Sequence, residues 1–367
     1  MAWTTNRGRR SAAVLLTAVM AVFLSCCAGS PRPAEPTEVR VVSLGDSIAR
    51  GYGCQPEEAY GALLAEHLRG ELPADRFTVR FLNNGVDGDT TGDLLRRLET
   101  GEVRRAVEEA DVVTLSIGGN NLLHWLRDEL CALFDLDPAS PTLADELAAR
   151  FAGAGPVEAA QELAPLGALL TDKELPVRAE ESVEVFRDQA GQVLEAIRES
   201  NSDALVLVTT IPNPVGGGPL GALCGLMLNA YNESIRALPE SGEEGLLVAD
   251  SAAAFKEYTG DQPLSFAKVG WEDLGNWCLD PHPTPLGQSL MAQAHYPLVR
   301  EFVDAFAART ASGSAVMSDD AAEGALVPQE SSAPMSDEER RIFWASAVSL
   351  LLAVAGGFLL LRKRPKP

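Results

Sequence analysis

The stretch that decides the fold is residues 39–47, VRVVSLGDS, in which an apolar run ends in a Gly-Asp-Ser turn. The run at 39–44 predicts a buried strand, and a helix can begin at Ile48. Ser47 is therefore expected at the carboxyl end of a strand, with its main-chain N–H at a helix start, where developing negative charge is favoured. A plain Ser or Asp helix cap explains the same tripeptide equally well.

Four more runs rich in Val, Leu and Ile predict further buried strands, at residues 77–82, 112–117, 204–211 and 245–249. Helical patterns lie between the runs, at residues 57–68, 91–108, 181–199 and 223–238. This alternation predicts an α/β fold in which a parallel sheet carries helices on both faces. Ligands bind such sheets at the carboxyl ends of the strands, so the loops there are the candidate site.

Residues 122–180 form an insertion that is far longer than a crossover between two strands requires. Its several short helical patterns are interrupted by Pro138, Pro141, Gly153 and Pro156. Because the insertion follows a strand end directly, a cap over the site and a plain packing insertion fit it equally well.

Both ends of the chain predict export and membrane anchoring. Arginines precede an apolar run, so residues 1–27 resemble a secretory signal, although Cys26 also allows an N-terminal lipoprotein cysteine. Residues 342–361 carry no charge and are long enough to span a bilayer, and the basic tail at 362–367 favours the cytoplasmic side. We expect a single-pass cell-membrane protein whose folded part is extracytoplasmic.

One folded domain is expected between these ends. Residues 28–37 form a short linker, and residues 310–341 are rich in Ala, Ser, Gly, Asp and Glu with little apolar periodicity, which is typical of a flexible spacer. The remaining residues, 38–309, are a length that one α/β domain can fill.

The second and third predicted strands end in loops that contain Gly and Asn. Gly88 lies in the first loop, residues 83–91, and Asn120 lies in the second, residues 116–121. Gly lets the main chain approach a ligand closely and the Asn amide is an uncharged donor, so both loops can direct N–H groups at an oxyanion. Each loop alone also fits an ordinary strand-to-helix turn.

The chain has four histidines, and one has the surroundings of a general base. His67 and His295 lie in helical patterns and are interpreted as surface or packing residues, and nothing near His124 in the sequence orients it. His282 lies in a loop between two prolines, with Asp280 two residues before it. A carboxylate so close can hold the imidazole in one tautomer, as a general base requires.

Four motifs follow one another along the chain: Gly45-Asp46-Ser47, Gly88-Asp89-Thr90, Gly118-Gly119-Asn120-Asn121 and Asp280-Pro281-His282-Pro283. In this order they resemble the four blocks of the GDSL/SGNH hydrolases, a family of secreted esterases and lipases that includes lysophospholipases and thioesterases. The resemblance spans nearly the whole domain. It implies the SGNH hydrolase fold, a flavodoxin-like three-layer α/β/α sandwich with a five-stranded parallel sheet.

The resemblance also implies a role for each motif. Ser47 would be the nucleophile, His282 the general base and acid, and Asp280 its orienting carboxylate. The oxyanion donors would be the backbone N–H groups of Ser47 and Gly88 and the side-chain amide of Asn120. No cofactor and no metal is implied.

Two positions depart from the family pattern. The family usually places its Asp three residues before the His, where this chain has Leu279, so Asp280 reaches the imidazole only through an altered turn, or a main-chain carbonyl orients the ring instead. The third block commonly ends in Asn-Asp. Here it ends in Asn121, which leaves the donor Asn120 intact but changes its support.

Cysteines outside the signal are even in number, and disulfides persist in an exported protein. Three pairings of Cys54, Cys131, Cys224 and Cys278 are open from the sequence. We favour Cys54 with Cys278, which flank the first and last motifs, and Cys131 with Cys224, which follow two loops on the same side of the sheet.

These residues predict a serine esterase that forms an acyl-enzyme on Ser47 and hydrolyses a lipid, a lysophospholipid or another acyl or acetyl ester. Two alternatives use the same fold: an acyltransferase or deacetylase acting on envelope glycans, and a non-catalytic module that binds a ligand in the cleft. The formal net charge of −22 argues against nucleic acid as a partner, because phosphate binding needs clustered Lys and Arg. We expect a monomer that meets its ester substrate outside the cytoplasm and the membrane through its C-terminal helix.

Overall fold

The computed structural model describes residues 36–99, 101–143, 146, 172–216, 218–241, 245–267 and 280–311. Its sheet contains β1 (Thr37–Gly45), β2 (Phe77–Gly85), β3 (Val112–Ser116), β4 (Leu205–Thr209) and β5 (Leu246–Ala249). Neighbouring strands are parallel, and their order across the sheet is β2-β1-β3-β4-β5, the order of flavodoxin-like sheets. Each predicted strand is confirmed, with differences only at its ends.

The helices also follow the predicted alternation, except that the patterns at 57–68 and 91–108 each form two elements. They are α2 (Ser47–Arg50), η1 (Pro56–Glu58), α3 (Tyr60–Glu71), α4 (Thr91–Leu98), α5 (Gly101–Glu108), α6 (Gly119–Phe134), α9 (Leu175–Ser200), α10 (Gly218–Arg236), η2 (Leu238–Ser241), α11 (Ser251–Glu257) and α12 (Pro285–Ala311). The helical pattern at 91–108 forms two helices rather than one. Gly101 has a φ of 80°, a left-handed conformation that interrupts a helix.

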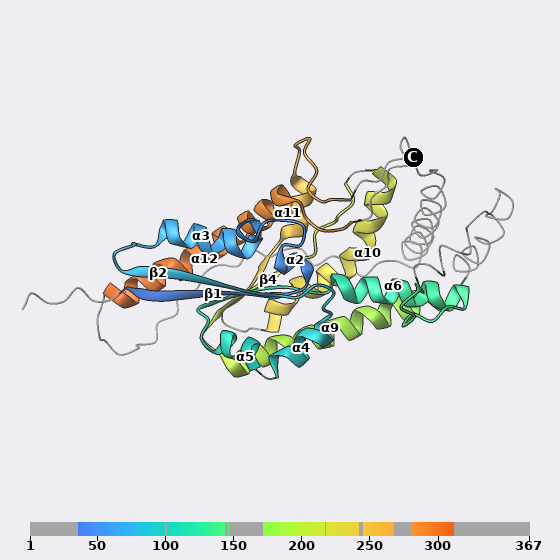
Figure 1. Ribbon diagram of the computed structural model, residues 1–367, viewed down its shortest axis with the longest axis horizontal. Coiled ribbons are helices and arrows are strands. Elements are labelled where there is room, and N and C mark those ends of the chain that lie inside the picture. Colours follow the sequence, from blue (N-terminus) through green and yellow to red (C-terminus); the bar gives the residue numbers. More distant parts are fainter. Residues whose placement is uncertain are drawn as a thin grey trace, which may run out of the picture.

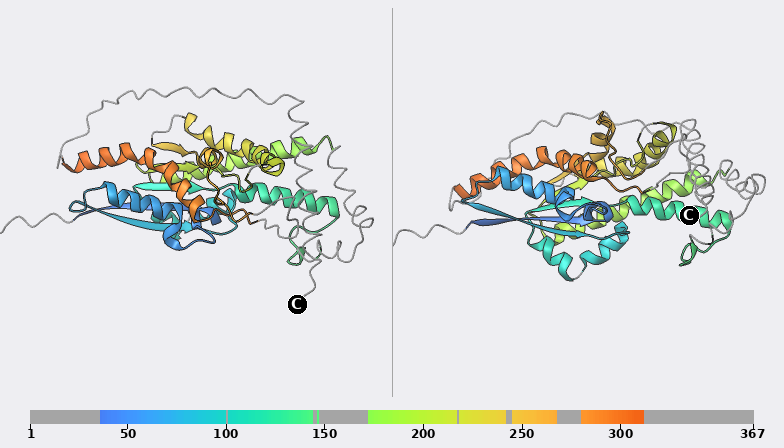
Figure 2. Two further views of the ribbon diagram at one scale, coloured as in Figure 1. Left: turned by 90° about the horizontal axis from the view of Figure 1, so that it is seen from above. Right: turned by 45° about the horizontal axis from the view of Figure 1, so that its top comes forward.

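Helices cover both faces of the sheet, which makes the fold three-layered (Figure 1). On one face, α4, α5, α9 and α10 contribute residues such as Leu94, Val193 and Tyr231 to a core with β1, β3 and β4. On the other face, Leu64 of α3 and Val299 of α12 pack against the same strands. Figure 2 shows α3 and α12 running side by side, and the two helices are in contact.

The carboxyl ends of β1, β2 and β3 lie next to one another. Gly45 of β1 is opposite Gly85 of β2 and Ser116 of β3 in the sheet register. A Cβ atom on Gly45 would lie 1.9 Å from the carbonyl oxygen of Ser116, and Gly45 has a φ of 133°. Only glycine fits both constraints, so its presence lets the three loops that carry predicted site residues begin at one edge of the sheet.

Part of the insertion at 122–180 is described. It begins within α6, which leaves the carboxyl end of β3, and it ends within α9. The predicted signal, the spacer and the C-terminal apolar segment at 342–361 lie outside the described residues. Among the helices that are described, none has the length and apolar character needed to cross a membrane.

The predicted disulfide between Cys131 and Cys224 is wrong, because both residues are free thiols. Cys131 is buried on α6, and Cys224 on α10 packs against the main core. Cysteine behaves in such places as a small apolar residue, so burial alone accounts for both positions. Cys54 is also free, and its predicted partner Cys278 lies outside the described residues.

The contact at Gly45 predicts a large loss of stability on substitution. Gly45→Ala adds a methyl group against the Ser116 carbonyl in a left-handed conformation and should lower the free energy of unfolding by about 3 kcal/mol. Gly70→Ala is the matched control, because a Cβ atom there meets nothing within 4 Å and the residue lies inside α3. Chemical denaturation should show the control unchanged or slightly more stable. Equal stability of the two variants would contradict the role given to Gly45.

Candidate active site

Ser47 is held at the end of β1 by short-range hydrogen bonds. Asp46 caps α2, with its Oδ1 accepting from the N–H of Ile48 at 2.9 Å, and its own N–H donates to the Ser116 carbonyl at 3.1 Å. The helix ends one turn later at Gly51, which has a φ of 79°. This strand, turn and short helix leave Ser47 8% exposed at the sheet edge.

Ser47, His282 and Asp280 form a hydrogen-bonded chain, which is the arrangement that the family resemblance implies. His282 Nε2 lies 2.8 Å from Ser47 Oγ, and His282 Nδ1 lies 2.5 Å from Asp280 Oδ1. The same Oδ1 accepts from the main-chain N–H of His282 at 3.0 Å. Asp280 therefore closes a side-chain turn on the residue that it orients, which is how an Asp only two positions before the His reaches the ring. The altered turn is present, and the carboxylate rather than a main-chain carbonyl contacts Nδ1.

A second segment of the chain holds the His282 loop in place. Ser265 and Pro283 form an isolated antiparallel bridge, and the Phe266 N–H donates to the His282 carbonyl at 2.9 Å. The Thr284 N–H donates to the Leu264 carbonyl at the same distance. These bonds make residues 264–266 a short strand-like support for the histidine.

Gln288 connects this loop to the serine side of the site, a role that no sequence motif indicates. Its Oε1 accepts from the Tyr60 N–H at 2.9 Å, and its Nε2 donates to the Ile48 carbonyl at 3.2 Å. The side chain is fully buried on the first turns of α12. It therefore ties the helix after His282 to the helix that begins at Ser47.

The predicted oxyanion residues lie in two loops that contact each other. Asn120 is in the first turn of α6, and its Nδ2 donates to the Asp89 carbonyl at 3.0 Å, directly after Gly88. An amide carries two N–H bonds, and this contact uses one of them. Gly88 has a φ of 82°, and a Cβ atom there would meet nothing within 4 Å. The Val86 N–H joins the Gly88 loop to the Gly45 carbonyl at 3.0 Å, next to the Gly-Asp-Ser turn.

Asn121 replaces the family's Asp with a structural link. Its Nδ2 donates to Thr91 Oγ1 at 2.8 Å, and its Oδ1 accepts from the Thr91 N–H at 3.1 Å. Arg97 supports the same region from α4, because its Nη1 donates to Asp89 Oδ2 at 2.5 Å and its Nη2 donates to the Asn84 carbonyl at 2.7 Å. Both residues fix the loop on which Asn120 rests. Asn121 belongs to the third motif, whereas no motif includes Arg97.

The other histidines have no place in this chain of contacts. His67 stacks on Tyr296 with ring centroids 4.0 Å apart. His295 is buried, lies 3.1 Å from Thr209 Oγ1 through Nε2, and has its pKa lowered to about 4 by burial. His124 is not in contact with Ser47 in any described interaction, and no described group of three or more His, Cys, Asp or Glu side chains could hold a metal ion.

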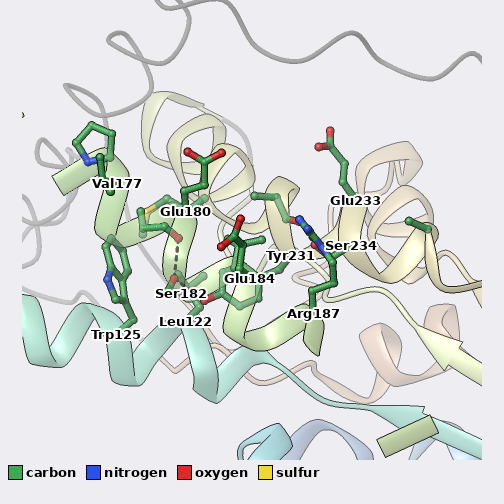
Figure 3. Close-up of a pocket in the computed structure, with 16 residues that line it drawn as sticks. Leu122, Trp125, Val177, Glu180, Ser182, Glu184, Arg187, Tyr231, Glu233 and Ser234 are labelled. Atoms are coloured by element: carbon green, nitrogen blue, oxygen red, sulfur yellow. Dashed lines mark hydrogen bonds between the residues drawn. The ribbon is translucent and has the colours of Figure 1, made fainter. Parts of the chain in front are cut away.

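A cavity of about 670 Å³ lies between α6, α9 and α10 (Figure 3). Its apolar lining includes Leu122, Trp125, Val177 and Met227, and charged side chains lie at the same site, among them Glu180. The first and last parts of the insertion thus line one hollow. None of its lining residues belongs to the Ser47–His282–Asp280 chain, but α6 begins at the site and reaches the cavity within two turns.

Comparison with known families identifies this arrangement. The family model described as "GDSL-like Lipase/Acylhydrolase family" matches residues 43–290, about two thirds of the chain, from the Gly-Asp-Ser turn through His282. The chain belongs to the GDSL-like lipase/acylhydrolase family. Members of this family are named for lipase and acylhydrolase activity, so this GDSL-like chain is a hydrolase by family.

Individual relatives of this GDSL-like hydrolase are distant. The uncharacterized protein YpmR of Bacillus subtilis (strain 168) is 31% identical over 93 residues, which cover 25% of this chain and 36% of that protein. A lipase from a goat rumen metagenome is 19% identical over 71% of this chain and 96% of its own, with a TM-score of 0.45. The extracellular lipase of Streptomyces rimosus is 20% identical over 72% of this chain and 99% of its own, with a TM-score of 0.43.

The buried Asp46 of this GDSL-like hydrolase predicts a pH-dependent stability. Burial, with the nearby Asp89 carboxylate, raises the pKa of Asp46 from its ordinary 3.8 to about 7. A raised pKa means that the folded state holds the proton more tightly than the unfolded state does. Protonated Asp46 therefore contributes fully to stability below about pH 4, and this contribution is lost as the pH rises toward 7. Over that range the free energy of unfolding of the wild type should fall by up to roughly 4 kcal/mol more than that of Asp46→Asn. The Asn side chain keeps the oxygen that caps α2.

Denaturant titrations of both proteins from pH 4 to pH 8 measure this difference. The variant removes the titration without removing the acceptor for the Ile48 N–H, so a parallel pH dependence of the two proteins would show that Asp46 is ionised in the fold.

Proposed function

We propose that this chain is an extracytoplasmic serine esterase, anchored in the cell membrane by residues 342–361, that hydrolyses neutral acyl esters. The observation that carries the proposal is the chain of contacts from Ser47 Oγ to His282 Nε2 and from His282 Nδ1 to Asp280. A hydroxyl, a base and an orienting carboxylate in this order are the parts that acyl transfer requires.

The reaction proceeds in two halves. Ser47 Oγ forms a bond to the ester carbonyl carbon while its proton passes to His282 Nε2, and the same nitrogen returns the proton to the departing alcohol as the C–O bond breaks. Water then repeats the sequence on the acyl-enzyme and releases the acid and the serine. Asp280 accepts from Nδ1–H throughout, which keeps Nε2 unprotonated and facing the hydroxyl before attack.

The oxyanion donors are the Ser47 and Gly88 backbone N–H groups and the free N–H of the Asn120 amide. Asn120 is held by the Asp89 carbonyl, and Asn121 and Arg97 keep that loop in position. Donors that are fixed before the reaction stabilise the developing charge without reorganising, and each is worth about 2–4 kcal/mol of the barrier. This support explains why the family's Asp can be an Asn here.

The cavity between α6, α9 and α10 supplies the place for the acyl chain. Its lining of Leu122, Trp125 and Val177 favours an alkyl chain, and its volume is in the range of small-molecule sites. The acidic side chains Glu180, Glu184 and Glu233 lie beside it, against one basic residue, Arg187 (Figure 3). This charge balance disfavours anionic esters, which is why we propose neutral ones.

The first test is hydrolysis of p-nitrophenyl esters by the full-length chain, beside Ser47→Ala. The wild type should be active and should react with a fluorophosphonate, whereas Ser47→Ala should lose at least about 10³-fold in kcat/KM and remain unlabelled. Activity of Ser47→Ala equal to that of the wild type would reject the serine mechanism. Transfer of the acyl group to a glycan in preference to water would favour the acyltransferase alternative.

The second test places a large side chain in the cavity. Val177 is 48% exposed and lines the cavity, and Val185 is 53% exposed on the same helix without lining it. Val177→Trp should lower kcat/KM for long-chain p-nitrophenyl esters about ten-fold relative to p-nitrophenyl acetate, because two or more methylene groups lose their burial. Val185→Trp is the matched control and should leave the chain-length profile as it is. Identical profiles for both variants would place the acyl chain elsewhere.

A further inference from the structure

We propose that Tyr52 is a positioning residue for His282: its ring lies against the imidazole and holds it in the orientation in which Nε2 faces Ser47. The inference rests on the proposed esterase function. The two ring centroids are 4.4 Å apart with an angle of 36° between the planes. Tyr52 lies outside the four motifs that carry the family resemblance.

The contact supplies a restraint that the hydrogen bonds of the imidazole lack. His282 bonds to Asp280 through Nδ1 and to Ser47 through Nε2. The lone pair and the N–H of imidazole nitrogens are directed in the plane of the ring. Neither bond opposes a tilt of the ring out of that plane strongly. A side chain packed on the ring face does, since a tilt would drive the two rings into each other.

The main chain fixes Tyr52 where this contact requires it. The Tyr52 N–H donates to the Ser47 carbonyl at 3.0 Å, so the tyrosine is bonded to the nucleophile's own residue. Gly51 and Gly53 on either side have φ values of 79° and 80°. A Cβ atom would lie 2.8 Å from the Ala59 side chain at Gly51 and 2.7 Å from the Phe266 ring at Gly53. Two glycines in this conformation turn the chain so that the intervening side chain meets the histidine.

The residues next to Tyr52 also hold the histidine loop. Gly53 packs against Phe266, whose N–H donates to the His282 carbonyl at 2.9 Å. The Cys54 thiol donates to the Pro283 carbonyl at 3.5 Å. Three consecutive residues after the nucleophile's helix therefore engage the base, its following residue or the segment that supports it. These contacts connect the segment that follows Ser47 to the loop that carries His282.

Neither burial nor a described side-chain hydrogen bond explains why a tyrosine is at position 52. Tyr52 is 45% exposed, one of the few large apolar residues in the described chain with so much exposed surface. No described hydrogen bond comes from its hydroxyl group. A half-exposed aromatic ring gains little stability from burial, so its contact with His282 is the interaction that the position supplies.

The test compares Tyr52→Phe with Tyr52→Leu in the full-length chain. Phe keeps the aromatic face and should retain kcat within about two-fold. Leu has no flat face and should lower kcat about ten-fold with KM changed less than two-fold, because the loss is one of geometry at the reacting atoms. The rate of fluorophosphonate labelling should fall by the same factor as kcat. The thermal unfolding midpoint should stay within about 1 °C, because surface substitutions change stability little.

Several outcomes would overturn this role. A kcat of Tyr52→Leu equal to that of the wild type would reject the positioning role. A change in KM alone would indicate that Tyr52 contacts the substrate instead. A loss in Tyr52→Phe as large as that in Tyr52→Leu would assign the effect to the hydroxyl group. Wild-type activity that depends on Ser47, together with an unaffected Tyr52→Leu, would leave the esterase intact and reject only the positioning role. A wild-type chain with neither hydrolysis nor labelling would reject both proposals.

Discussion

The arrangement of the site depends on how closely the ends of β1 and β3 approach. At Gly45 there is no space for even one carbon atom beyond the backbone, because the Ser116 carbonyl occupies it. This approach lets the Asp46 N–H bond to β3 and brings the turn before Ser47 beside the loop that begins α6. Strand register therefore places Ser47, the Gly88 loop and Asn120 near one another, without the need for contacts between their side chains.

His282 is positioned by loop contacts rather than by the sheet. No strand places it, because it lies in a loop after β5 and before α12. Its position depends instead on the Asp280 turn, on the bridge to Ser265 and on Gln288. Half of the site is therefore built from sheet geometry, and the other half is built from loop hydrogen bonds that converge on it.

The sequence was sufficient for the fold and for the residues at strand ends. Periodic apolar runs determine strands directly, and four motifs in order placed Ser47, Gly88, Asn120 and His282. The sequence was not sufficient for Gln288 and Arg97, because each bonds main-chain groups that have no sequence signature. It marked Asn121 as a departure from the family pattern but did not show its link to Thr91, 30 residues away. It left open whether Asp280 reaches the ring, because that depends on the turn at Pro281 and not on spacing alone.

The disulfide between Cys131 and Cys224 failed for a related reason. An even number of cysteines and a predicted export signal favour pairing, but they contain no information on the distance between two helices. Apolar burial explains the same residues without a bond. The number of cysteines therefore predicts disulfides less well than the positions of the cysteines on helices and strands do.

The span between Ser47 and His282 has a consequence for how the chain acquires its function. The two residues are 235 positions apart, and α12, which follows the histidine, packs against α3, which follows the serine. A chain is made from its N-terminus at about 5–20 residues per second, so the serine exists for roughly 10 s or more before the histidine is synthesised. Contacts so distant in sequence also form late in folding. A partly made or truncated chain thus carries its nucleophile without a base, and it stays inactive until α12 packs against α3.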